Sequence, residues 1–164
     1  MALINMAALR AGVVRGQRLI GLDPGARTIG MALSDVGLML ASPYGALPRG
    51  KLRAAAAAIL ALAAKEGVGG LVVGLPLSMD GTVGPAAQAA RDWGLALSEA
   101  TGLPGAMWDE RLSSAAVNRM LIGADVTRAK RAAVVDGLAA AYTLQAALDA
   151  TSVSVGGADR GWLV

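Results

Sequence analysis

Short apolar runs, separated by glycine and proline, predict three strands in the first third of the chain. The run Arg18–Asp23 ends at Pro24-Gly25, and Thr28–Ser34 follows as a second apolar run. Leu38–Leu47 predicts a third strand around a Ser-Pro bend. The turns between the three runs are short enough for an antiparallel meander.

Helical and extended patterns alternate in the rest of the chain. Lys51–Glu66 is an alanine-rich helical pattern that stops at a cluster of glycines, and Leu71–Leu75 is a continuous apolar run typical of a strand buried on both faces. Pro85 favours the first turn of a helix that reaches about Ala100. The remaining expected elements are a strand at 104–108 and helices at 113–121 and 128–149.

The order of these elements predicts one α/β domain. Three meandering strands, followed by alternating helices and strands, give a mixed five-stranded sheet flanked by helices, which is the ribonuclease H-like arrangement. A doubly wound dinucleotide-binding fold is disfavoured because two hairpins precede the first helix. Residues 1–17 show no clear period and are expected to form a flexible leader, 18–150 form the domain, and the Gly- and Ser-rich 151–164 form a tail.

The amino-acid composition limits the kinds of catalytic and metal-binding site that the chain can form. Only 16% of the 164 residues are charged, against about 25% in a typical domain, and 55% are hydrophobic. The chain has no histidine and no cysteine. This excludes zinc fingers, Cys and Ser–His nucleophiles and haem ligation by histidine. Any metal must bind to oxygen ligands, which favours Mg²⁺ or Mn²⁺.

Charge spacing argues against a membrane protein. The longest runs without Asp, Glu, Lys or Arg are Val36–Pro48 and Gly67–Met79, each 13 residues long. A spanning helix needs about 20 apolar residues, so neither run can cross a bilayer. We therefore expect a cytoplasmic protein with no membrane partner.

Basic residues form clusters along the chain. Lys and Arg number 15 against 12 for Asp and Glu, a net charge of +3 with a pI near 9.8. Such clusters suit contacts with phosphates, although proteins that bind no nucleic acid often carry a similar excess. The clusters are Arg10, Arg15 and Arg18; Arg49, Lys51 and Arg53; and Arg128, Lys130 and Arg131.

Three acidic positions are candidates for catalysis. Asp23 ends a predicted central strand beside Pro-Gly, where it either caps a turn or presents a carboxylate next to a loop that a phosphate can approach. Asp136 has only alanines three and four residues away, so a salt bridge within its helix does not account for this acid. A solvated surface acid stays an alternative. Asp109-Glu110 follows the last strand, where an ordinary acidic helix start is the alternative. Separated acids of this kind can converge on divalent ions that activate water and stabilise a leaving oxygen.

Four ordered motifs resemble the YqgF/RuvX family over about residues 18–150. That family has the ribonuclease H-like fold and is described as Holliday-junction resolvases and as nucleases that mature the 5′ end of pre-16S rRNA. The motifs are Gly-Leu-Asp-Pro-Gly-Ala-Arg-Thr-Ile-Gly at 21–30, Val-Gly-Leu-Pro-Leu-Ser-Met-Asp-Gly-Thr at 73–82, Asp-Glu-Arg-Leu-Ser-Ser at 109–114 and Val-Asp-Gly-Leu-Ala-Ala at 135–140.

The resemblance implies a set of site residues. Asp23, an acid of the 109–110 pair and Asp136 would bind metal. Adjacent side chains of a strand point in opposite directions, but the chain turns here, so alternation does not choose between the two acids. We predict Glu110 as the ligand because it is longer, with Asp109 as a helix cap or substitute ligand. The resemblance also places Arg27 and Arg111 near phosphates, and the basic cluster adds Arg128, Lys130 and Arg131 as phosphate contacts. The substrate loop is assigned to Ser78, Asp80 and Thr82.

Two departures from related proteins accompany these assignments. Ser78 stands where the family usually has Asn. The predicted strand Leu71–Leu75 carries no acid, unlike the same strand in many junction resolvases of this fold, so the acid must come from the 109–110 pair.

The sequence therefore predicts a metal-dependent nuclease acting on structured RNA or branched DNA. Two alternatives remain: a non-catalytic RNA-binding factor, and an actin-like or sugar-kinase-type ATP binder whose phosphate loop resembles Asp23 to Gly30. The few aromatic residues disfavour the first, and the absence of a second lobe disfavours the second. Symmetric cutting of two strands would call for a homodimer.

Overall fold

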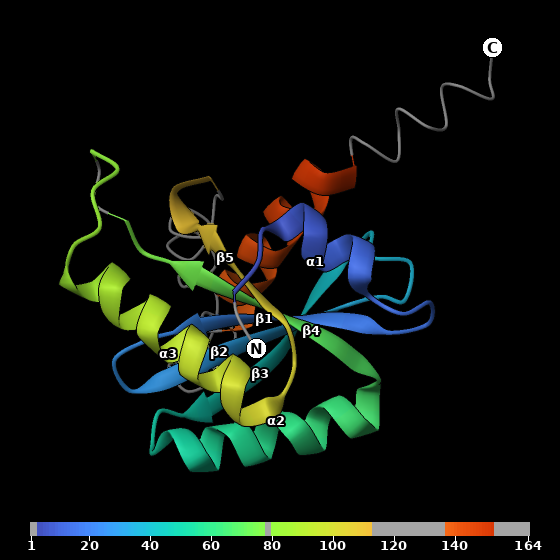
Figure 1. Ribbon diagram of the computed structural model, residues 1–164, viewed down its shortest axis with the longest axis horizontal. Coiled ribbons are helices and arrows are strands. Elements are labelled where there is room, and N and C mark those ends of the chain that lie inside the picture. Colours follow the sequence, from blue (N-terminus) through green and yellow to red (C-terminus); the bar gives the residue numbers. More distant parts are fainter. Residues whose placement is uncertain (1–2, 78–79, 113–136, 153–164) are drawn as a thin grey trace, which may run out of the picture.

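The computed structural model describes residues 3–77, 80–112 and 137–152, which build a five-stranded mixed sheet in the order β3-β2-β1-β4-β5 (Figure 1). The first three strands pair antiparallel, whereas β4 lies parallel to both β1 and β5. This topology confirms the expected meander and the ribonuclease H-like fold class. The strands are β1 (Arg18–Pro24), β2 (Thr28–Ser34), β3 (Ala41–Pro48), β4 (Val68–Leu75) and β5 (Gly105–Asp109).

Helices cover both faces of the sheet (Figure 1). One face carries α2 (Leu52–Glu66) and α3 (Pro85–Thr101), and the other carries α1 (Met6–Gly12) and the helical residues 137–152. A single 3-10 turn, η1 (Glu110–Leu112), follows β5. Of the two helices expected near the end of the chain, 113–121 and the first part of 128–149 lie outside the described residues.

Each face of the sheet has its own hydrophobic core, because neighbouring residues of a strand point to opposite faces. The α2–α3 core contains residues such as Ile20, Leu22, Ile59, Leu71, Val73 and Leu97. The core beneath α1 and residues 137–152 contains Leu9, Leu19, Val72, Ala106, Leu144 and Leu148.

Helix α1 replaces the flexible leader that the sequence predicts for residues 1–17. Met6 and Leu9 are buried, and the side chain of Asn5 caps the helix by accepting a hydrogen bond from Ala8 N at 2.7 Å. Arg10 Nη1 donates to the carbonyl of Leu148 at 2.9 Å. The helix has only seven residues, too few to show a helical period, and its stability comes from contacts with distant segments.

Two strand boundaries also differ from the prediction. β3 begins at Ala41 rather than Leu38, because Oδ1 of Asp35 accepts hydrogen bonds from Met39 N and Leu40 N and holds this segment in a turn. β4 begins at Val68 rather than Leu71, since Val68 and Gly70 pair with Arg18 and Leu19 of β1.

None of the helices in the described ranges has the length and apolar character that crossing a bilayer requires.

Candidate active site

The carboxyl ends of β1, β4 and β5 lie at the same edge of the sheet, because these three strands are parallel. Asp23 is the penultimate residue of β1, is half-buried and pairs with Gly30 of β2. Asp109 is the last residue of β5, and Glu110 follows it directly. The fold thus brings two of the predicted acidic positions to one edge of the sheet.

Two glycines identify the face on which these acids lie. A Cβ atom added to Gly21 would lie 2.9 Å from Cβ of Leu144, so a side chain at position 21 would face the helical residues 137–152. Asp23 is two residues further along β1 and therefore points to the same face. On β4, Val72 packs into the core of this face, so Gly74 faces it as well.

The carboxylate of Glu110 lies over Gly74. A Cβ atom added to Gly74 would be 2.7 Å from Oε1 of Glu110 and 3.3 Å from its Cδ. Leu22 pairs with Val73, and the register carried one step further sets Asp23 beside Gly74. Asp23 therefore approaches Gly74 from β1, and Glu110 approaches it from the side of β5.

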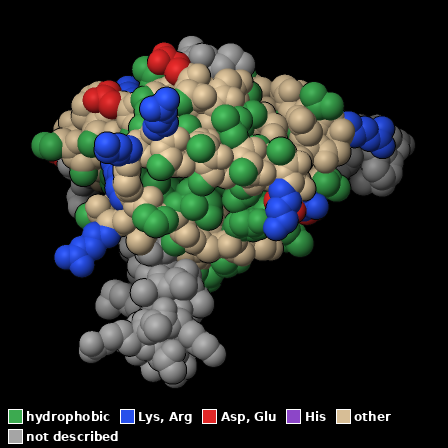
Figure 2. All heavy atoms as spheres, turned by 90° about the horizontal axis from the view of Figure 1, so that it is seen from below, with side chains coloured by type: hydrophobic (Ala, Val, Ile, Leu, Met, Phe, Trp, Pro, Cys, Tyr) green, Lys and Arg blue, Asp and Glu red, His purple; other side chains and the backbone are tan. Residues whose placement is uncertain are grey.

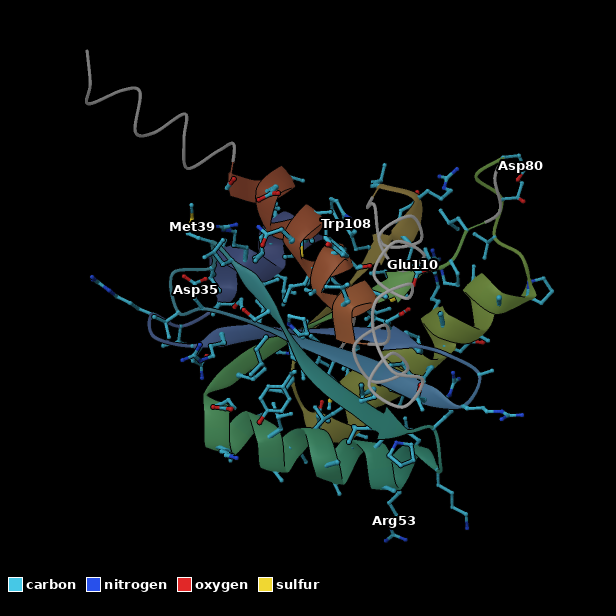
Figure 3. The ribbon with its side chains drawn as sticks, turned by 180° about the vertical axis from the view of Figure 1, so that it is seen from behind. Asp35, Met39, Arg53, Asp80, Trp108 and Glu110 are labelled. Atoms are coloured by element: carbon cyan, nitrogen blue, oxygen red, sulfur yellow. The ribbon has the colours of Figure 1, made fainter. Side chains whose placement is uncertain are left out.

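Glu110 lies on the same face as Trp108, as it would if the extended strand continued. Trp108 is half-buried and packs against the core beneath residues 137–152. Within the described part of the chain, its buried Nε1 has no hydrogen-bond partner. Figure 3 shows Glu110 and Asp80 towards one side of the molecule and Asp35 and Met39 towards the other.

Asp109 forms a salt bridge with Arg111. Its Oδ2 lies 2.6 Å from Nη2 of Arg111, and its Oδ1 accepts a hydrogen bond from Arg111 N at 2.9 Å. These hydrogen bonds, with the side-chain bonds the largest cause, hold the pKa of the Asp109 carboxyl below its ordinary value. Asp109 therefore makes the capping contact that the sequence suggests for it, and a guanidinium already neutralises its charge.

The predicted substrate loop contacts this pair. Oδ1 of Asp80 accepts hydrogen bonds from the hydroxyl of Thr82 at 2.7 Å and from its backbone N at 3.0 Å, and the hydroxyl bond is the main reason that the pKa of Asp80 lies below its ordinary value. A Cβ atom added to Gly81 would lie 3.6 Å from Nη1 of Arg111. Arg111, assigned to phosphate from the sequence, thus lies between Asp109 and the loop. Ser78 is outside the described residues.

The loop after β1 is held by a residue whose role the sequence analysis missed. Arg49 Nη1 donates to the carbonyl of Gly25 at 2.7 Å, and Arg49 N donates to the carbonyl of Arg27 at 2.8 Å. The Arg49 guanidinium carbon also lies 5.7 Å from the ring centroid of Trp93 on α3. Sequence gives no signal for these contacts because Arg49 and Gly25 are 24 residues apart. The Arg27 side chain itself is exposed.

The rest of the predicted site falls outside the described residues. This holds for Asp136 and for Arg128, Lys130 and Arg131. Across residues 3–77, 80–112 and 137–152, no three acidic side chains gather closely enough to hold a metal ion. Asp23 and Glu110 offer oxygen atoms alone, a donor set that fits a hard divalent cation.

The basic side chains that the structure describes do not form one continuous patch on the face that carries α2. Figure 2 shows them separated, with hydrophobic side chains between them. Lys51 and Arg53 are exposed there, whereas Arg49 is half-buried.

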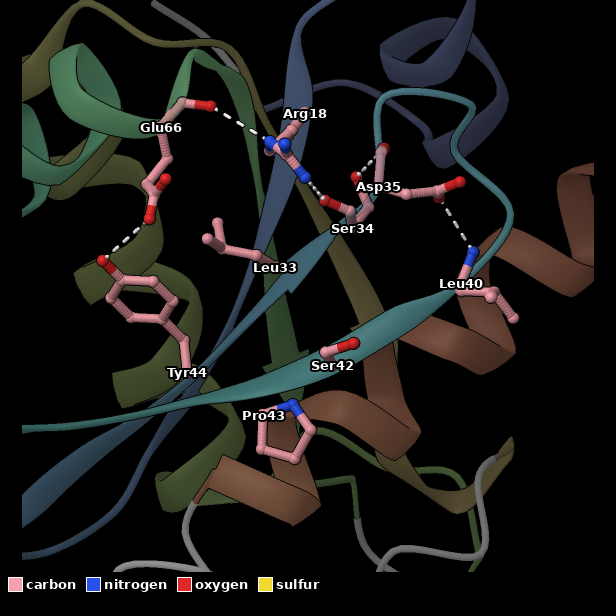
Figure 4. A pocket seen from close by; sticks show the side chains of 9 residues that line it. All are labelled: Arg18, Leu33, Ser34, Asp35, Leu40, Ser42, Pro43, Tyr44 and Glu66. Carbon is pink, nitrogen blue, oxygen red and sulfur yellow. Dashed lines mark hydrogen bonds between the residues drawn. The ribbon is translucent and has the colours of Figure 1, made fainter.

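A pocket of about 320 Å³ opens at the other end of the sheet (Figure 4). Arg18, the first residue of β1, lines it and donates to the carbonyls of Glu66 and Ser34. The Tyr44 hydroxyl donates to Oε2 of Glu66 at 3.0 Å. These polar groups hold the surrounding strands and helix together, and the pocket lies away from the edge that carries Asp23.

Comparisons with known proteins identify the family of this chain. A protein from Gluconacetobacter diazotrophicus named "Putative pre-16S rRNA nuclease" is 70% identical over 153 residues, covering 93% of this chain and 99% of its own length. A protein of the same name from Acidiphilium cryptum is 66% identical over 149 residues, 91% of this chain and 94% of the relative. RuvC from Thermus thermophilus in complex with a Holliday junction substrate aligns with a TM-score of 0.49 at 14% identity, over 85% of this chain and 96% of that one. The family model described as "RuvX: Holliday junction resolvase" matches residues 17–150, and the chain belongs to this family of nucleases.

Proposed function

We propose that this nuclease depends on a divalent metal, Mg²⁺ or Mn²⁺, held by Asp23, Glu110 and Asp136. The observation that carries the proposal is the position of the Glu110 carboxylate over Gly74, next to the strand end that carries Asp23. When bound, such ions activate a water molecule and stabilise the leaving oxygen of a phosphodiester. Hydrolysis at this edge of the sheet needs no histidine, and the chain has none.

Asp109 and Arg111 have a supporting role in this proposal. Because the guanidinium pairs with Asp109, the carboxylate of Asp109 is turned away from metal binding and fixes Arg111 against Gly81. Arg111 therefore orients the substrate loop and carries positive charge towards an approaching phosphate. Arg27, exposed on the loop after β1, adds a second cation at the same edge of the sheet.

The proposed substrates are structured nucleic acids. The names of the relatives support the 5′ end of pre-16S rRNA, and the description of the family supports four-way DNA junctions. For a junction, two strands must be cut symmetrically, which requires two sites related by a two-fold axis. We propose that the chain acts on junctions as a homodimer, which light scattering of the protein–junction complex tests.

Carboxylate-to-amide variants test the site. Asp23→Asn and Glu110→Gln should each abolish Mn²⁺-dependent cleavage of a pre-16S rRNA fragment and of a four-way junction. Asp109→Asn should keep measurable activity. Asp35→Asn is the matched control, since Asp35 holds a turn far from this edge and asparagine keeps its acceptor oxygen.

The outcomes distinguish the alternative functions. If Glu110→Gln is folded and has wild-type turnover while Asp109→Asn is inactive, then Asp109 binds the metal and Glu110 is the supporting acid. Nucleic-acid binding without cleavage in the wild type under any metal would favour an RNA-binding factor. Saturable ATP binding would favour the ATP-binder alternative.

A further inference from the structure

We propose that Gly74 is a positioning residue that seats the Glu110 carboxylate, and that its lack of a side chain lets the carboxylate lie beside Asp23. The proposal rests on the proposed function, in which Glu110 binds metal. It adds a residue of β4 to a site whose acids come from other segments.

Steric contacts carry the proposal. A Cβ atom at position 74 would lie 2.7 Å from Oε1, 3.2 Å from Cγ and 3.3 Å from Cδ of Glu110. These three atoms, all from one side chain, are its nearest neighbours. Carbon and oxygen atoms that are not bonded do not approach to 2.7 Å without strain, so any larger residue must displace the carboxylate.

The backbone gives no other reason for glycine here. Gly74 is not among the glycines with positive φ, which are Gly16, Gly45, Gly67, Gly81 and Gly102. Any residue can adopt its extended conformation, and glycine inside a strand lowers stability relative to alanine. The Glu110 side chain therefore explains the glycine, and backbone geometry does not.

The geometry also explains how β4 can lack an acid. Gly74 pairs with Trp108 on β5, and the β1–β4 register carried one step beyond Leu22 and Val73 sets Asp23 on its other side. Glu110 extends from the turn after β5 and delivers its carboxylate to the space where a side chain at position 74 would stand. A carboxylate attached to position 74 itself would occupy nearly the same place.

The first experiment compares Gly74→Ala with Gly70→Ala. Gly70 is the matched control because it is on the same strand, and its added Cβ would meet two fully buried core side chains, Cδ1 of Leu9 at 2.8 Å and Cδ2 of Leu19 at 2.9 Å. We expect Gly74→Ala to keep the wild-type Tm, to bind Mn²⁺ about 10- to 100-fold more weakly by calorimetry and to cleave about 100-fold more slowly. Gly70→Ala should lower the Tm and leave Mn²⁺ affinity unchanged.

A crystal structure of metal-free Gly74→Ala gives a readout independent of activity. The Glu110 carboxylate should be displaced from its position over residue 74, while β4 and β5 stay in place. A carboxylate at its original position together with wild-type Mn²⁺ affinity would overturn the proposal.

The second experiment moves the acid. Gly74→Asp combined with Glu110→Ala should regain at least tenfold of the Mn²⁺ affinity that Glu110→Ala alone loses. No gain in affinity in a folded double variant would overturn the proposal. An active Glu110→Gln protein would overturn the proposed function, whereas an inactive Glu110→Gln beside a fully active Gly74→Ala would overturn the role of Gly74 alone.

Discussion

Replacing Gly21 with alanine should lift residues 137–152 from the sheet. The added Cβ would lie 2.9 Å from Cβ of Leu144 and 3.1 Å from the carbonyl oxygen of Ala140. Ordinary carbon contacts are about 3.5–4.0 Å long, so the helix must retreat by roughly 0.6 Å or more. Neither contact atom can rotate away, because one is backbone and the other is attached directly to it.

The magnitude follows from two opposing effects. Overpacking of a core costs about 1–3 kcal/mol, and the lower backbone freedom of alanine in the unfolded chain returns about 0.5–1 kcal/mol. We expect the free energy of unfolding of Gly21→Ala to fall by about 1–2 kcal/mol, which lowers the Tm by roughly 2–8 °C in a chain of this length.

Urea and thermal denaturation measure this change, with Gly50→Ala as the control. An added Cβ at Gly50 meets no atom within 4 Å, and its φ is not positive. If Gly21→Ala and Gly50→Ala unfold alike, the close approach of Leu144 to β1 does not hold.

Three further predictions concern the site. Arg49→Lys keeps the charge but loses the planar guanidinium, so cleavage should fall about tenfold at a nearly unchanged Tm, and unchanged cleavage would contradict a role in holding the loop after β1. The folded pKa of Asp109 is lowered, so its contribution to stability is present above about pH 4 and lost as the pH falls through the folded pKa. The Tm difference between wild type and Asp109→Asn should be small for this partly exposed pair and should shrink on acidification from pH 7. A Tm difference that stays constant with pH would contradict this contribution of Asp109. Nucleic-acid binding, measured by fluorescence anisotropy, should weaken steeply as the salt concentration rises. Joint replacement of Arg128, Lys130 and Arg131 should weaken binding to unrelated nucleic-acid sequences by similar factors. An affinity that does not change with salt would contradict both expectations.

Local patterns were sufficient to predict most of the sheet. An apolar run predicts β2 at Thr28–Ser34, and the proline at position 85 predicts the start of α3. The structure confirms both positions. The capping contact of Asp109 was also predictable, because it needs only the next two residues.

Long-range contacts explain what the sequence did not reveal. Helix α1 depends on Leu148, 138 residues away from Arg10. The sequence pattern indicates that Gly70 ends a helix, whereas in the structure Gly70 leaves room for Leu9. The pattern places Gly74 in a buried strand, and it gives no sign that Glu110 fills the space beside Gly74. A glycine pattern shows that a side chain is missing, but only the folded chain shows what fills the space.

The contact between α1 and residues 137–152 affects the order in which the protein can fold during synthesis. A ribosome makes the chain from the N-terminus at about 5–20 residues per second, so α1 emerges many seconds before its partner exists. Until Leu144 and Leu148 have emerged, Leu9, Leu19 and Val72 lack the side chains that bury them in the finished core. In the nascent protein, the part of this sheet face that α1 does not cover therefore stays open to solvent until residues 137–152 have been made.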